Sequence, residues 1–251
     1  MNGTPPGWAA PPPTGAPPSA APPNAPRPAW APPPPPVRSA KGLAVALACL
    51  VPAAVLINGL QLAFQPTEIR VEGSTVMQNH NGWGVLALPI GLAAIVVGVV
   101  WSYRVVANAR AVGDPTRPSP GWAVGSWFIP FAHLVLPFFP LREAWGKSRA
   151  GSLASLVVWW AVWALYLAVS YVAFSWGFVA GFQEGMDVAT GRSQVIETPP
   201  ALVALQWVGM GLYAAAGAFF LAVVFRFEKA QRRMGAWLQG RRAVPATPGL
   251  P

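Results

Sequence analysis

Four long apolar segments set the limits on how this chain can fold. They cover residues 43–64, 83–101, 153–176 and 201–225, and none of them contains Asp, Glu, Lys or Arg. About 20 helical residues, at a rise of about 1.5 Å each, cross a hydrocarbon core of about 30 Å. A soluble protein needs a charged surface, but charged residues make up only 10% of these 251 residues. The sequence therefore predicts an all-α integral membrane four-helix bundle.

The basic residues predict the orientation of this bundle. Of the 17 Lys and Arg residues, only Arg70 and Arg192 lie in the connections after the first and third segments; the other fifteen lie before the first segment, between the second and third, or after the fourth. Because short loops rich in Lys and Arg stay cytoplasmic, we expect both termini and the central connection to be cytoplasmic, in a bacterial inner membrane. Topology and anionic lipid account for these charges without a nucleic-acid partner.

The two ends of the chain differ from the membrane domain, which we expect to cover residues 41–233. Sixteen of the 30 prolines fall between Pro5 and Pro36. Such a stretch buries too little apolar surface to fold, so residues 1–40 are predicted to be a disordered, Pro-rich cytoplasmic tether with polyproline II character. The tether either docks to a cytoplasmic protein through its proline run or is simply solvated. Residues 234–251 are predicted to be a short, basic, flexible tail.

The segment 118–145, between the second and third apolar segments, is apolar enough to resemble a fifth span. If it crossed the membrane, however, seven basic residues would lie on the cytoplasmic side and ten outside, instead of fifteen and two. Pro130, Pro137 and Pro140 each remove a helical N–H and displace a carbonyl, and freed backbone groups are not tolerated facing lipid. We therefore expect a Pro-broken interfacial or re-entrant element on the cytoplasmic side, with Trp127 and Trp145 as anchors at the headgroups.

One motif within this segment carries a resemblance to a known family. The motif follows the sequence WSYRVVANAR and consists of Trp127, Pro130, His133, Leu134, Pro137, Arg142, Glu143 and Trp145. Over roughly residues 43–233 the chain resembles the bacterial membrane proteins of the DUF4328 family. That resemblance implies a membrane location and no particular activity. The family often has Asn where this chain has His133, which argues against a mechanism that needs an imidazole.

The apolar segments contain a few uncharged polar side chains. Those of interest are Asn58, Gln61, Tyr166, Ser170, Gln206 and Tyr213. Polar side chains in membrane helices usually form hydrogen bonds between helices, and the alternative is that they line a path for a substrate. Among the tryptophans, Trp83 and Trp101 are expected at the two headgroup belts. Trp159, Trp160 and Trp163 are expected to pack in the bundle or against lipid, or else to form an aromatic wall for an apolar ligand.

Three classes of function stay open. The favoured class is a membrane scaffold or interaction protein that presents its cytoplasmic face to a partner or to anionic lipid. The alternatives are a small transporter or channel and, less favoured, a membrane enzyme. No catalytic, cofactor or metal-binding motif is found, and Cys49 is the single cysteine, so we expect no enzyme, no cofactor and no metal site. A water-filled cavity that reaches Asn58 and Gln61 would shift the interpretation to transport.

Overall fold

The computed structural model describes residues 37–65, 68–72, 75–77, 83–110, 119–129, 132–191 and 195–243. This part of the chain contains four helices long and apolar enough to cross a membrane: α1 (Lys41–Ala63), α2 (Trp83–Arg110), α5 (Ala154–Ala189) and α6 (Pro200–Ala243). The four predicted apolar segments are thereby confirmed as helices that could span a membrane, as expected of a multi-pass membrane protein. The predicted tether lies outside the described residues, apart from residues 37–40.

Three of the four helices are much longer than the apolar segments within them. Helix α6 has 44 residues, which at the α-helical rise is about 66 Å, or roughly twice a hydrocarbon core. It continues through residues 234–243, where we predicted a flexible tail. The reason is that this stretch is rich in Ala, Arg, Gln and Leu, which are good helix formers, and the first proline after Pro200 is Pro245.

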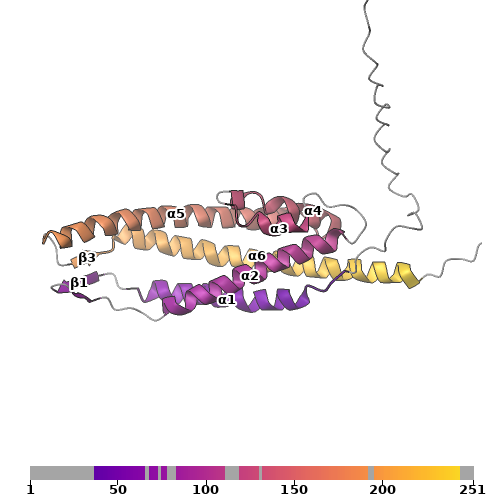
Figure 1. Ribbon diagram of the computed structural model, residues 1–251, viewed down its shortest axis with the longest axis horizontal. Helices are drawn as coiled ribbons and strands as arrows, with labels where there is room; N and C mark the ends of the chain where they lie inside the picture. Colours follow the sequence, from indigo (N-terminus) through magenta and orange to yellow (C-terminus); the bar gives the residue numbers. More distant parts are fainter. Residues whose placement is uncertain are drawn as a thin grey trace, which may run out of the picture. The chain divides into compact units, whose positions relative to one another are not determined.

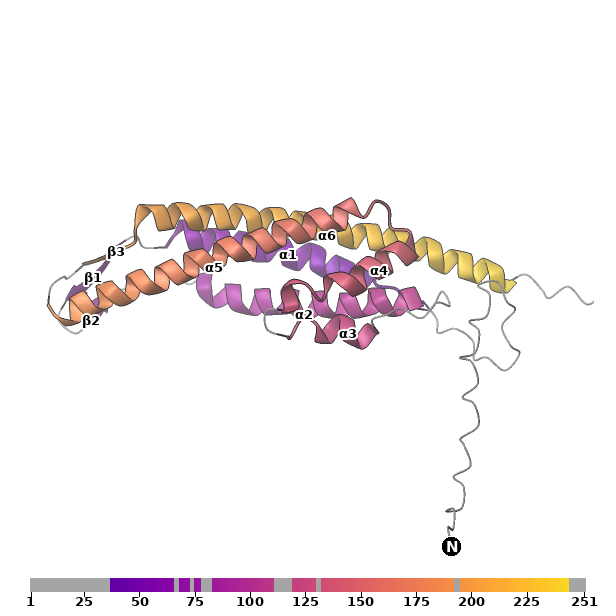
Figure 2. The same cartoon turned by 90° about the horizontal axis from the view of Figure 1, so that it is seen from above.

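The long helices pack as neighbours in the order α2, α1, α6 and α5 (Figures 1 and 2). Their shared buried core lies towards the end of the bundle that α3 and α4 cover, and includes Leu47 of α1, Trp101 of α2, Leu156 of α5 and Phe227 of α6. Elsewhere the helices expose large apolar side chains. Exposed apolar surface of this extent is expected where lipid is the solvent.

The prediction that Trp101 lies in a headgroup belt is wrong. Its side chain is fully buried, and its ring packs edge-on against Phe220 and Phe227 of α6 at centroid distances of 5.5 and 5.6 Å. The sequence analysis placed Trp101 at a span end because the apolar run ends there. Helix α2 in fact continues for nine residues to Arg110, so Trp101 lies inside the packed region.

A small antiparallel sheet joins two of the connections. Its strands are β1 (Glu68–Glu72), β2 (Thr75–Met77) and β3 (Val195–Glu197), in the order β2-β1-β3. Arg70 of β1 is opposite Met77 of β2 and also opposite Val195 of β3. The sheet therefore ties the α1–α2 connection to the α5–α6 connection (Figure 1). The sequence analysis predicted no strands, because the β1–β3 pairing joins residues far apart in the sequence and short strands carry little periodic signal.

The segment predicted to be broken contains three short helices: α3 (Pro120–Gly125), the 3-10 helix η1 (Ala132–Leu134) and α4 (Phe138–Ser148). Ser119 caps α3 by accepting the N–H of Trp122, and Pro137 is the residue before α4. Pro140 falls in the first turn of α4, where a helical N–H needs no partner within the helix. Our expectation that Pro140 breaks a helix is therefore wrong. Pro130 lies outside the described residues.

The expectation that Trp145 is a headgroup anchor is also wrong. Only 2% of its side chain is exposed. Its indole N–H donates to the carbonyl of Gly151 at 2.9 Å, and its ring packs edge-on against Phe227 with the centroids 4.9 Å apart. Helix α4 packs on α2 and α6, so this face of α4 turns towards protein and not towards lipid.

Candidate functional site

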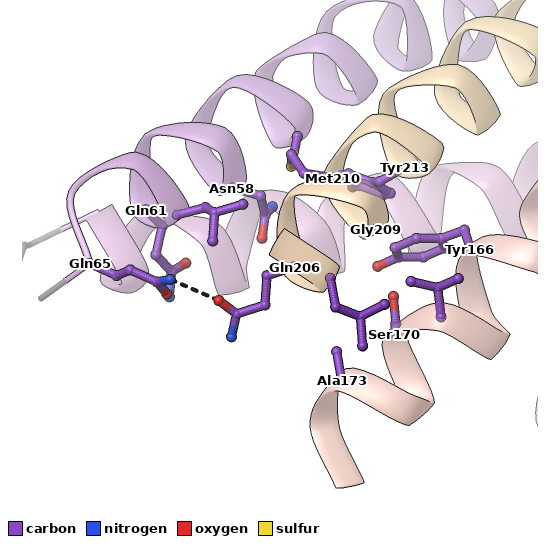
Figure 3. A pocket seen from close by; sticks show the side chains of 13 residues that line it. Asn58, Gln61, Gln65, Tyr166, Ser170, Ala173, Gln206, Gly209, Met210 and Tyr213 are labelled. Carbon is purple, nitrogen blue, oxygen red and sulfur yellow. Dashed lines mark hydrogen bonds between the residues drawn. The ribbon is translucent and has the colours of Figure 1, made fainter. Parts of the chain in front are cut away.

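The uncharged polar side chains of the apolar segments come together in one pocket. The pocket has a volume of about 290 Å³ and is lined by residues of α1, α5 and α6 (Figure 3). Its polar lining residues are Asn58, Gln61, Gln65, Tyr166, Ser170, Gln206 and Tyr213. All six polar residues that the sequence analysis singled out lie in this α1–α5–α6 pocket. None of the described lining residues carries a charge.

Helical spacing explains why these residues meet. Residues three and four positions apart share one face of a helix, and this is the spacing of Asn58 and Gln61 on α1 and of Tyr166 and Ser170 on α5. Gln65 follows the end of α1 by two residues. Helices α1 and α5 both pack along α6 but make few contacts with each other in the described residues. The pocket is therefore a gap between α1 and α5 whose floor is a face of α6.

Small residues keep the helices close at this level. A Cβ atom added at Gly209 of α6 would lie 3.7 Å from a methyl carbon of Val169 and 3.9 Å from the hydroxyl of Ser170, both on α5. One added at Gly59 of α1 would lie 3.7 Å from the terminal methyl of Met210. These are ordinary van der Waals distances. The helices therefore pack closely at both glycines, although an added Cβ would not clash at either position.

Hydrogen bonds and ring contacts hold the polar side chains in place. The side-chain amide of Gln65 donates to the side-chain carbonyl of Gln206 at 2.8 Å, joining the end of α1 to the beginning of α6 (Figure 3). Asn58 donates to the carbonyl of Ala54 at 2.8 Å, one turn earlier on its own helix. The rings of Tyr166 and Tyr213 lie 5.1 Å apart. The pocket thus offers amide and hydroxyl groups that can both donate and accept hydrogen bonds.

Gln65 is the pocket residue that the sequence analysis missed. It follows the apolar segment directly and was assigned to the connection after it. Its spacing of seven residues from Asn58 and four from Gln61 was the signal that could have found it, because these intervals put all three on one helical face.

The conspicuous tryptophans of α5 hold the segment between α2 and α5. Trp127 packs against Trp160 and Trp163 at centroid distances of 6.2 and 6.0 Å. The indole N–H of Trp160 donates to the carbonyl of Leu134 at 2.8 Å, and His133 meets the ring of Trp163 at 6.3 Å. Three members of the candidate motif therefore contact two tryptophans of α5.

The other described members of the motif are divided between core and surface. Pro137 is fully buried, as is Trp145, whereas Arg142 is exposed. Glu143 forms an ion pair with Lys147 across one turn of α4, at 3.0 Å. The third tryptophan of the α5 cluster, Trp159, packs on Phe220 of α6 at 5.1 Å. Most of the motif therefore serves to dock α3, η1 and α4 on the long helices.

Neither a cluster of metal ligands nor the cysteine lies at this pocket in the part of the chain that the structure describes. In the part of the chain that the structure describes, no group of three His, Cys, Asp or Glu side chains could hold a metal ion. Cys49 is exposed on α1 and does not line the α1–α5–α6 pocket. What the arrangement can do is bind an uncharged polar group by hydrogen bonds within a membrane domain.

Comparison with known proteins gives a family but no activity. No curated protein and no solved structure matches this chain. The family match begins after α1, so Asn58, Gln61 and Gln65 lie before it, whereas the α5 and α6 residues of the pocket fall within it. It also includes all eight residues of the candidate motif. The chain belongs to the family described as a domain of unknown function, DUF4328, which matches residues 67–229.

Proposed function

We propose that this protein is a small inner-membrane transporter that takes up an uncharged polar solute through the α1–α5–α6 pocket. The observation that carries the proposal is the convergence of seven polar side chains from three apolar helices on one pocket. A polar group inside a membrane protein needs a partner, and side chains that serve only to join helices point at each other. Here they also line open space that a small solute can occupy.

The proposed orientation gives this pocket an entrance from the outside. With both termini cytoplasmic, the end of α1 and the beginning of α6 face outwards, and these are the ends that Gln65 and Gln206 occupy. The pocket lining on this side runs from Gln65, two residues after α1, back to Asn58, which lies more than one turn inside the helix. The segregation of basic residues supports this orientation.

The absence of charge in the lining favours an uncharged solute. A cation or anion that left water would need an opposite charge to compensate its desolvation, and none of the described lining residues offers one. Amide and hydroxyl groups instead match the hydrogen-bonding groups of a polyol or a small amide. Binding and passage of such a solute require no chemical step, so we propose that the protein is not an enzyme.

Solute flux into proteoliposomes tests the proposal. Glycerol, erythritol and glucose are the uncharged probes, and sodium chloride is the charged one. We expect at least one uncharged probe to enter faster than into protein-free liposomes, and the variants Gln206→Leu and Tyr213→Phe to lower that rate. Gln183→Leu is the matched control, because Gln183 lies on α5 outside the pocket. Equal rates with and without protein for every uncharged probe would exclude transport of this solute class.

A second candidate function rests on the opposite end of the helices. Exposed basic residues gather there from several elements, namely Arg38, Lys41, Arg110, Arg142, Arg149, Arg226, Lys229 and Arg233. This surface supports the scaffold interpretation, in which the cytoplasmic face meets an acidic partner or anionic lipid. Co-purification of a partner from the native membrane by the full chain, and its loss when residues 4–36 are deleted, would favour the scaffold over the transporter.

A further inference from the structure

A buried carboxylate lies at the end of the bundle that carries the basic residues. Glu228 is on α6, three residues after the apolar segment ends, and only 6% of its side chain is exposed. Its Oε1 atom has no hydrogen-bond partner among the described residues. The Nε atom of Arg232 lies 3.6 Å from Oε1, and the Arg232 side chain is 66% exposed. A carboxylate held away from water with so weak a partner is costly.

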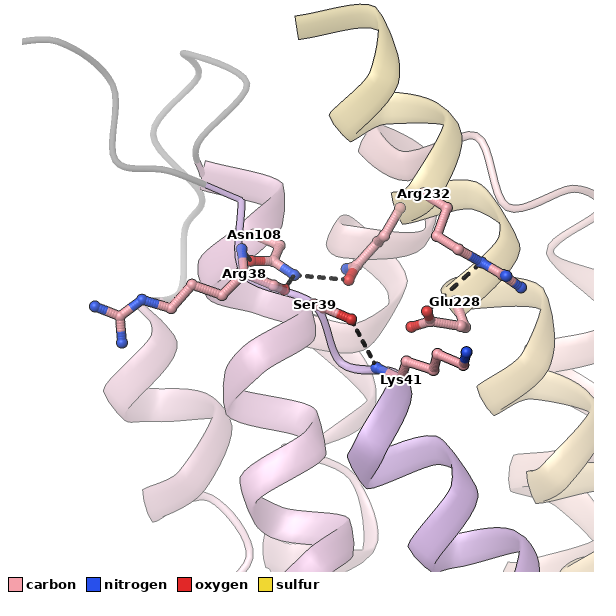
Figure 4. A network of polar contacts seen from close by, with 7 residues as sticks. Arg38, Ser39, Lys41, Asn108, Glu228 and Arg232 are labelled. Atoms are coloured by element: carbon pink, nitrogen blue, oxygen red, sulfur yellow. Dashed lines mark hydrogen bonds and ion pairs between the residues drawn. The ribbon is translucent and has the colours of Figure 1, made fainter. Parts of the chain in front are cut away.

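This carboxylate lines a second pocket, the Glu228 pocket. It has a volume of about 230 Å³, and its lining includes Glu228, Gln231 and Arg232 of α6 and the segment from Val37 to Ala40 that precedes α1. Arg38 and Arg232 both line the pocket, and both are exposed. The pocket therefore combines one buried negative group with the guanidinium group of Arg232 nearer to solvent, whereas the side chain of Arg38 points away from both (Figure 4).

A buried network of hydrogen bonds builds the walls of this pocket. Asn108 of α2 donates to the backbone carbonyl of Arg38 at 2.8 Å and accepts the backbone N–H of Arg38 at 3.0 Å. Asn108 also donates to the side-chain carbonyl of Gln231 at 2.9 Å, and Gln231 donates to the backbone carbonyl of Val105 at 3.0 Å. Three separate parts of the chain are thus fixed around Glu228 before any ligand arrives.

The Glu228 pocket lies at the level of lipid headgroups. Helix α1 begins at Lys41, and the apolar segment of α6 ends at Phe225 and is followed by Arg226. The residues that line the pocket stand just beyond these two points. Basic side chains at such positions lie among the phosphates of the adjacent leaflet. A lipid headgroup is therefore the molecule with direct access to this pocket.

We propose that the Glu228 pocket binds a phosphoethanolamine group, the headgroup of an aminophospholipid. Its primary ammonium donates to the Glu228 carboxylate, and its phosphate lies beside the guanidinium group of Arg232. A charge-assisted hydrogen bond to Oε1 supplies the partner that this atom lacks. A choline headgroup has no N–H to donate, and a glycerol headgroup has no positive charge to balance the carboxylate. Both are therefore bound less tightly.

Native mass spectrometry of the full chain, with equimolar phosphatidylethanolamine, phosphatidylcholine and phosphatidylglycerol in the detergent, tests this proposal. We expect phosphatidylethanolamine to be retained about tenfold over each of the other two, which is the scale of one charge-assisted hydrogen bond. Glu228→Gln keeps the size of the side chain and should reduce that preference to about twofold or less. The matched control is Glu143→Gln, which changes a carboxylate on α4 that is paired with Lys147 and should keep the preference.

Two further measurements make the result decisive. Arg232→Gln leaves Glu228 in place and should weaken retention of all three lipids, so the proposal stays testable if the Glu228 variant fails to fold. Soluble phosphoethanolamine, added without aminophospholipid, distinguishes the source of the ligand: we expect it to bind at least about tenfold more weakly than the lipid because it lacks anchoring chains. Equal retention of the three lipids, or a preference unchanged in Glu228→Gln, overturns the proposal.

Discussion

The two pockets of this molecule use amide side chains in different ways. In the Glu228 pocket, Asn108 and Gln231 are 3% and 4% exposed, and their amides bond to the backbone of neighbouring segments. In the α1–α5–α6 pocket, Asn58 and Gln206 are only half-buried, and the bond from Gln65 to Gln206 joins two helix ends. The first pair fixes protein against protein, whereas the second borders space that a solute can enter. Burial and bonding partners, not residue type, distinguish structural amides from binding amides.

The largest expected effect concerns the side of the membrane on which each pocket lies. Gly146 on α4 and Gly185 on α5 both have open space where a Cβ would stand, so each accepts a cysteine in a Cys49→Ser background. An impermeant maleimide added to intact cells should label Gly185→Cys fully and Gly146→Cys hardly at all, because the proposed orientation, which follows from the basic residues, puts α4 in the cytoplasm.

Labelling after cell lysis is the control, and both cysteines should then react. Labelling of Gly146→Cys in intact cells would show that the segment 118–145 crosses the membrane or that the bundle is inverted. In either case the α1–α5–α6 pocket would no longer open to the outside, and the comparison of an outer solute site with an inner headgroup site would fail.

The next effect separates the structural amides from the binding amides. Asn108→Leu removes three hydrogen bonds and leaves buried groups of Arg38 and Gln231 without partners, which we expect to cost about 3 kcal/mol of folding stability. Gln206→Leu removes one half-buried bond and should cost about 1 kcal/mol or less. Thermal unfolding in detergent measures both, and a larger loss for Gln206→Leu would reverse our assignment of the two amide pairs.

A smaller effect tests how closely α1 and α6 pack against each other in the region between the two pockets. A Cβ at Gly217 of α6 would lie 2.9 Å from a methyl carbon of Val51 on α1. Because Val51 is β-branched and its methyl cannot swing away, Gly217→Ala should force α1 and α6 apart and cost about 1–3 kcal/mol. Gly209→Ala is the matched control, since its nearest neighbour would stand at 3.7 Å, and should change the unfolding temperature little.

Much of this architecture could be predicted from the sequence, and the failures have physical causes. Four uncharged apolar runs are sufficient evidence for four spans, and helical spacing brought all six singled-out polar residues to one pocket. Trp101 and Trp145 were misplaced because an aromatic residue at the end of an apolar run has the same sequence pattern whether it meets a headgroup or another helix. Only the packing of α4 and α6 decides which.

The Glu228 pocket could not be predicted for a related reason. Glu228 looks like one member of a charged helix end, surrounded by Arg226, Lys229 and Arg232. Its burial depends on where the segment before α1 lies, and Asn108 holds that segment from 70 residues further along the chain. No local pattern reports a contact of this kind, so the sequence analysis gave Glu228 no role.

The smallest expected effect concerns His133, the one described histidine. It is half-buried and meets the edge of Trp163 at 6.3 Å, a contact worth about 1 kcal/mol or less. His133→Asn keeps a polar side chain of similar reach while removing the imidazole ring. If solute passage depends on the amides and hydroxyls of the α1–α5–α6 pocket, flux should be unchanged at pH 6 and at pH 8.

Trp163→Phe is the companion variant, since it alters the same contact without touching a titratable group. A loss of flux in His133→Asn but not in Trp163→Phe, with normal topology in both, would mean that a proton accompanies the solute and that the segment holding His133 takes part in transport.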